Sequence, residues 1–81
     1  MTDARQAILD ITDAENTVDL EAILERFAEE CGCELDTAST YEESLERFRD
    51  EAEQNHNTEQ LCIVLEAAIE RWHKLERSSA A

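Results

Sequence analysis

The apolar residues between positions 20 and 31 recur at a spacing that an α-helix brings to one face. They are Leu20, Ile23, Leu24, Phe27, Ala28 and Cys31. Residues three or four positions apart lie side by side on a helix, so this set forms one continuous stripe. Gly32, the only glycine in the chain, follows directly, where helices commonly end on a left-handed residue. The pattern predicts an amphipathic helix, and its apolar face must be covered by other parts of the chain.

A shorter helix is predicted before this one. Its apolar residues are Ala4, Ala7, Ile8 and Ile11. Thr2 or Asp3 can cap its start. We expect a break near Asn16-Thr17, because the side chains of both residues compete with helical hydrogen bonds. After Gly32, Cys33 and Leu35 alternate with acidic residues, which predicts a short extended link with two side chains turned inward.

Two overlapping capping boxes announce a third helix, one from Ser39 to Glu42 and one from Thr40 to Glu43. Its apolar stripe is narrow and consists of Tyr41, Leu45, Phe48 and Ala52. A loop is expected over residues 54–57.

The fourth predicted helix starts at Asn57 or Thr58 and has the widest apolar face of the chain. Its main stripe contains Leu61, Cys62, Leu65, Ala68, Ile69, Trp72 and Leu75. Ile63, Val64 and Ala67 fall outside this stripe. A small protein has few elements to cover such a surplus, which favours a homodimer or a docked partner through Val64 and Trp72.

These segments predict an all-α fold, arranged as a small bundle of three main helices plus a short N-terminal helix. Residues 1–77 are expected to form a single domain and residues 78–81 a frayed tail. The chain has no proline, so little interrupts its helices. A chain of 81 residues buries only ~60% of the surface that its unfolded form exposes, which makes its stability marginal.

Most of the negative charge lies in the first half of the chain. Residues 1–46 contain 14 acidic and two basic residues, a net charge of −12, whereas residues 47–81 contain seven acidic and five basic residues, a net charge of −2. Nucleic acid and anionic lipid would be repelled by this charge, so we expect neither as a direct partner. No apolar run approaches the ~20 residues of a membrane span, and no basic-then-apolar leader is present.

Two rows of acidic residues follow the predicted helices. Glu21, Glu25 and Glu29 stand four positions apart opposite the stripe of the second helix, and Glu42, Glu46 and Asp50 do the same on the third. Like charges at this spacing destabilise a helix by a few tenths of a kcal/mol per pair. These six residues are the candidate partner-binding site, and a solvated face that only keeps the chain soluble is the alternative interpretation.

No catalytic or metal site is expected. Cys31, Cys33, Cys62, His56 and His73 are ligand types, but a single residue separates Cys31 from Cys33, where structural zinc sites use two to four. Cys62 and His73 stand about 16 Å apart along one helix, too far for a nucleophile and its base. The odd number of cysteines favours free thiols, and therefore a cytoplasmic protein.

One family comparison excludes a further function. Residues 17–20 are similar to the start of the second helix of acyl carrier proteins, which are also small, acidic and helical. In that family an Asp-Ser-Leu motif carries the prosthetic group. Asp13-Ala14-Glu15 stands at that place here, so the hydroxyl is absent and carrier function is excluded.

The sequence therefore predicts a non-enzymatic protein without a cofactor. We expect it to bind a basic partner protein, itself one that binds nucleic acid, and to act as an inhibitor or regulator. This composition is typical of phage or mobile-element proteins that mimic nucleic acid, including anti-CRISPR proteins. The alternative is a small adaptor or structural subunit that dimerises or docks through its fourth helix.

Overall fold

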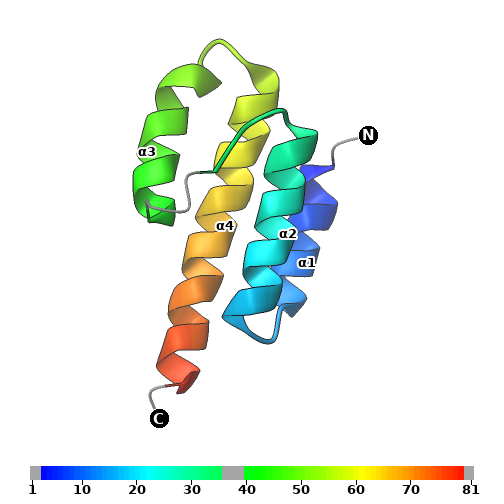
Figure 1. Cartoon of the computed structure of the whole chain (residues 1–81), viewed down its shortest axis with the longest axis vertical. Helices are drawn as coiled ribbons and strands as arrows, with labels where there is room; N and C mark the ends of the chain where they lie inside the picture. Colours follow the sequence, from blue (N-terminus) through cyan, green and yellow to red (C-terminus); the bar gives the residue numbers. More distant parts are fainter. Residues whose placement is uncertain (1–2, 36–39, 80–81) are drawn as a thin grey trace.

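The longest helix is the one to which the others attach. The computed structural model describes residues 3–35 and 40–79, with helices α1 (Ala4–Asp13), α2 (Thr17–Glu30), α3 (Tyr41–Ala52) and α4 (His56–Ser79). Helix α4 packs against each of the other three, and α1 packs against α2 (Figure 1). No other pair of helices makes close contact in the described ranges, and these ranges contain no strand. The predicted all-α class is confirmed.

The first helix starts at a predicted cap, and the second starts at the predicted break. The Asp3 carboxylate accepts hydrogen bonds from the backbone N–H groups of Arg5 and Gln6, at 3.0 and 3.3 Å. The Asn16 side chain accepts one from the N–H of Asp19 at 2.9 Å, so the break between α1 and α2 falls at the expected place. Thr2, the other candidate cap, lies outside the described residues.

Helix α2 ends at Gly32 as its sequence predicts. Gly32 has a φ of 76°, the left-handed conformation that glycine adopts without strain. Its N–H donates to the Glu29 carbonyl at 3.0 Å, and the N–H of Cys33 donates to the Ala28 carbonyl at 2.9 Å. These two bonds define a Schellman motif. It turns the chain so that Cys33 and Leu35 pack against the core, as expected for the link.

The caps of α3 and α4 lie close to their predicted positions. The Thr40 hydroxyl accepts from the N–H of Glu43 at 3.2 Å, whereas Ser39 lies outside the described residues. Helix α4 begins at His56, earlier than predicted, because the Asn55 side chain accepts from the N–H groups of Asn57 and Thr58. It continues to Ser79, past the predicted domain boundary at residue 77, and residues 80–81 of the expected tail lie outside the described chain.

The core forms where three helices meet α4. Val64 belongs to this core, contrary to its predicted role in self-association. Phe27, Leu65 and Val64 are all buried, and Val64 has no exposed surface. The expectation that Val64 is free for self-association is therefore wrong. Helix α4 has α3 on one side and α1 with α2 on another, so its apolar surface is covered by its own chain well beyond one ordinary helical face.

Candidate functional site

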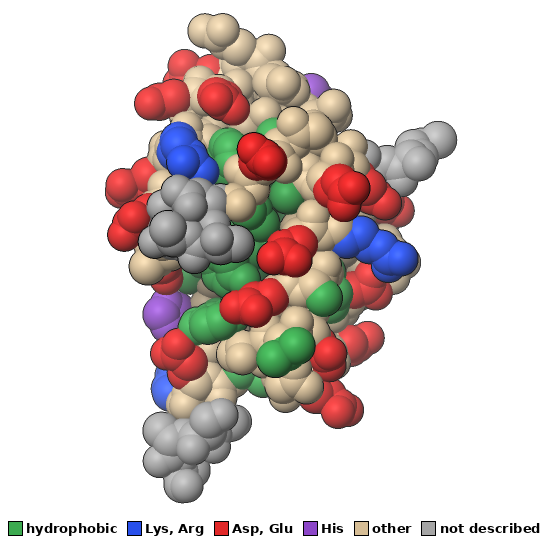
Figure 2. All heavy atoms as spheres, in the orientation of Figure 1, with side chains coloured by type: hydrophobic (Ala, Val, Ile, Leu, Met, Phe, Trp, Pro, Cys, Tyr) green, Lys and Arg blue, Asp and Glu red, His purple; other side chains and the backbone are tan. Residues whose placement is uncertain are grey.

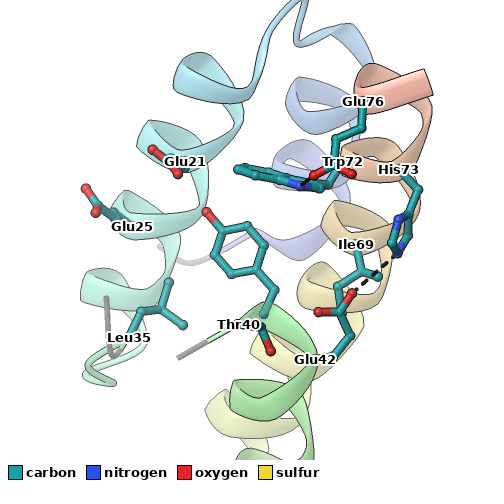
Figure 3. A pocket seen from close by; sticks show the side chains of 10 residues that line it. Glu21, Glu25, Leu35, Thr40, Glu42, Ile69, Trp72, His73 and Glu76 are labelled. Atoms are coloured by element: carbon teal, nitrogen blue, oxygen red, sulfur yellow. Dashed lines mark hydrogen bonds and ion pairs between the residues drawn. The ribbon is translucent and has the colours of Figure 1, made fainter. Parts of the chain in front are cut away.

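A groove runs between α2 and α3, with α4 as its floor (Figure 3). Helices α2 and α3 both pack against α4 but not against each other, and the groove lies between them. The cavity has a volume of about 500 Å³. Its lining consists of Glu21, Glu25, Leu35, Thr40, Tyr41, Glu42, Ile69, Trp72, His73 and Glu76. We refer to it as the α2–α3 groove.

An aromatic pair lies in the groove. The ring centroids of Tyr41 and Trp72 are 5.3 Å apart, and their planes are nearly perpendicular at 89°. This edge-to-face contact joins the first turn of α3 to α4, and such pairs contribute about 0.5–1.5 kcal/mol beyond the area they bury. The Trp72 indole N–H donates to the Glu76 carboxylate one turn further along α4. Both rings are only partly buried, so part of their surface is open to a ligand.

Carboxylates surround these rings. Glu21 and Glu25 come from α2 and lie across the groove from Trp72, whereas Glu42 comes from α3 and Glu76 from α4 (Figure 3). Figure 2 shows the same character on the face it displays, where acidic side chains border a strip of hydrophobic surface. The groove therefore combines an apolar floor with a negatively charged rim.

The charge of the rim acts on Tyr41. Burial, together with the negative charges of Glu21 and Glu25, raises the pKa of Tyr41 from 10.0 to about 12. The phenol therefore keeps its proton at neutral pH and remains a hydrogen-bond donor within the groove. The smaller, electrostatic part of this shift comes from the two carboxylates of α2, which make the potential at the aromatic floor more negative.

One rim carboxylate has a partner of opposite charge. Glu42 lies 3.3 Å from His73 Nε2 and links α3 to α4, although this contact is an ion pair only when His73 is protonated. Glu21 and Glu25 make no hydrogen bond or ion pair with a basic side chain of the described chain. They are therefore available to a cation from outside.

The structure divides the six predicted partner-binding residues into two groups. All six are exposed, as the face opposite each apolar stripe requires. Glu21, Glu25 and Glu42 line the groove, whereas Glu29, Glu46 and Asp50 lie outside it. Sequence reasoning missed Glu76, whose only signal was its place one turn after the single tryptophan.

The two residues predicted for self-association lie in different environments. Trp72 is partly exposed and lies in the groove, whereas Val64 belongs to the core. Its neighbour Ile63 is 42% exposed and is the large apolar residue that α4 presents to solvent. Ile63, not Val64, therefore marks the open apolar surface of α4.

The cysteines are suited to packing. Burial, more than any nearby charge, raises the pKa of Cys31 to about 11 and also raises the pKa of Cys62. Both thiols stay protonated at neutral pH and are therefore weak nucleophiles. Across residues 3–35 and 40–79, no three metal-ligating side chains lie close enough together to hold an ion. None of the helices in these ranges combines the length and the hydrophobicity that crossing a membrane requires.

Comparison with protein-family models, with curated proteins and with solved structures finds no match to this chain.

Proposed function

We propose that this chain is a non-enzymatic binding protein that inhibits or regulates a basic partner protein by occupying its charged surface. The observation that carries the proposal is the pair of exposed acidic rows. Of their six members only Glu42 has an ion-pair partner among the described residues; the rows are Glu21, Glu25 and Glu29 on α2 and Glu42, Glu46 and Asp50 on α3. The proposed partner is a protein that binds nucleic acid, and the proposed compartment in which the two proteins meet is the cytoplasm. Phage or mobile-element inhibitors such as anti-CRISPR proteins are the class that this combination fits.

The contrast with α4 supports a functional origin for the acidic rows. In α4, Glu70 lies 3.7 Å from Lys74 one turn later, and Glu66 lies 3.4 Å from Arg49 of α3. Glu21, Glu25 and Glu29 repeat at the same spacing without such compensation. The chain thus balances charge on one helix and leaves a small destabilising repulsion on two others, which a solubilising surface alone would not require.

Charge reversal tests this proposal. Glu25→Lys together with Glu46→Lys should abolish binding to a partner recovered by pull-down at low salt, with the loss seen first in the association rate. Both positions are exposed, so circular dichroism should be unchanged. Asp13→Lys with Glu53→Lys is the matched control, because it changes the net charge equally at exposed positions outside the two rows. Equal binding by parent and reversed protein would reject the proposal.

The alternative is an adaptor that docks through α4. The exposed side chain of Ile63 on α4 is the observation that favours it, and Trp72, also on α4, is partly exposed. In this interpretation the helices form a small bundle of three main helices plus α1, and the acidic rows only keep it soluble. Association should then persist at high salt and be lost on Ile63→Ser or Trp72→Ala, whereas the charge reversals should have no effect.

A further inference from the structure

We propose that the α2–α3 groove binds an arginine side chain from a basic segment of the partner. This inference rests on the proposed function. It adds that one arginine of the partner is held in this groove, within the broader acidic surface. Its guanidinium would lie on the aromatic rings between the carboxylates of α2 and that of Glu76 on α4, and its stem would lie along Ile69. The occupant is argued from charge complementarity and from the chemistry of the lining.

The position of the carboxylates favours a cation with several donors. Glu21 and Glu25 approach from α2, and Glu76 approaches from α4 on the other side. A guanidinium carries five N–H donors in a fixed plane and can bond carboxylates on two sides, whereas an ammonium is a compact point charge. Since Glu21 and Glu25 have no basic partner among the described residues, an arriving cation displaces no existing ion pair there.

The floor favours arginine over a small cation. Tyr41 and Trp72 each leave part of a ring exposed, and their contact holds both rings in place. The flat guanidinium stacks on aromatic rings, and the apolar stem of an arginine covers surfaces such as that of Ile69. The cavity of about 500 Å³ lies within the ~300–1,000 Å³ range of ligand sites. It has room for one long side chain and part of the backbone that carries it.

A second copy of the chain is the less favourable occupant. Each copy carries a net charge of −14, so bringing two together would place one acidic surface against another. A basic segment of a different protein is instead attracted by the negative charge of this chain.

The test uses the full chain and a short peptide, so it does not depend on identifying the partner. Trp72 is the only tryptophan, and its fluorescence therefore reports on the groove directly. The probe is acetyl-Gly-Arg-Gly-amide, and its matched control replaces arginine by citrulline, which has nearly the same shape without the charge. We expect the arginine peptide to bind at least about tenfold more tightly, the ratio expected when a charge-assisted hydrogen bond is lost.

Two matched variants locate the binding. Glu25→Gln removes one wall charge and should weaken arginine binding by about tenfold. Glu53→Gln makes the same chemical change at the far end of α3, about 18 Å along the helix from Tyr41, and should change binding by less than about twofold. Circular dichroism of both variants should match that of the parent, because both side chains are exposed.

Three results would overturn the inference. They are equal affinity for the arginine and citrulline peptides, equal weakening by Glu25→Gln and Glu53→Gln, and a fluorescence change on dilution without peptide, which would show that a second copy occupies the groove. The first two leave the proposed function standing, since a broad acidic face could still bind the partner. Conversely, specific arginine binding with no effect of charge reversal on the partner would reject the proposed function alone.

Discussion

Tyr41 reports the electrostatic character of the groove at the level of a single residue. It is the only tyrosine in the chain, so the ultraviolet absorbance of its phenolate can be followed without interference. We predict a titration midpoint near 12, because burial and the charges of Glu21 and Glu25 favour the neutral form. Glu25→Gln should lower this midpoint. An unshifted midpoint near 10 in the folded parent protein would contradict the described environment.

The same shift gives a pH dependence of stability with a defined sign. The folded pKa of Tyr41 is raised above its ordinary value, so the folded state holds its proton more tightly than the unfolded state does. This contribution to stability is complete below pH 10 and is lost as the pH rises towards 12. In Tyr41→Phe, the decrease in stability over this interval should be smaller.

Two core residues test the packing. Phe27 on α2 and Leu65 on α4 are buried, and truncation of either to alanine should reduce the free energy of unfolding by about 2–5 kcal/mol. Val18→Ala is the control, because Val18 is 71% exposed and its replacement should change stability by less than about 0.5 kcal/mol. Urea unfolding measures all three. Core variants that unfold at the parent's midpoint would show that these side chains are not packed as described.

At the level of elements, local signals predicted the helices well. The hydrogen bonds at Gly32 and Asn16 join residues that are close in sequence. Their roles could therefore be predicted from the neighbouring residues alone. Val64 shows the limit of this reasoning. Periodicity treats each helix alone, and it could not show that α4 is covered from two sides.

Gly32 allows a clean test of a helix end. A Cβ at this position would meet no atom within 4 Å, so the cost of an alanine substitution is confined to the backbone. Gly32→Ala should reduce stability by about 1–2 kcal/mol, because an L-residue is strained at a φ of 76°. Gly32→Asn should cost less, since asparagine tolerates this region. Equal stability of all three proteins in urea would show that the left-handed turn is absent.

At the level of the whole molecule, the charge excess should govern the response to salt. The ion pairs of the described chain are largely exposed and contribute little, whereas the net charge of −14 repels itself. The melting temperature should rise as sodium chloride increases from about 0.01 M to about 0.15 M, where the screening length falls from ~30 to ~8 Å. A steady fall over this interval would mean that attractive pairs outweigh repulsion.

The groove could be predicted only in part from the sequence. The charge of Glu21, Glu25 and Glu42 was visible in their spacing, but their meeting across a groove depends on how α2 and α3 are placed on α4. Trp72 was recognised as a candidate contact residue. Its pairing with Tyr41 joins residues from two helices, and no local pattern contains that information.

The attachment of α3 to α4 alone has a consequence for motion. Its separation from α4 would disrupt one helix interface, while the contacts among α1, α2 and α4 would remain. Such an opening separates Tyr41 from Trp72 and dismantles the groove without global unfolding. Opening of α3 and ligand binding therefore compete, because a ligand in the groove contacts α2, α3 and α4 at once. A bound ligand should slow amide hydrogen exchange in α3 more than in α1.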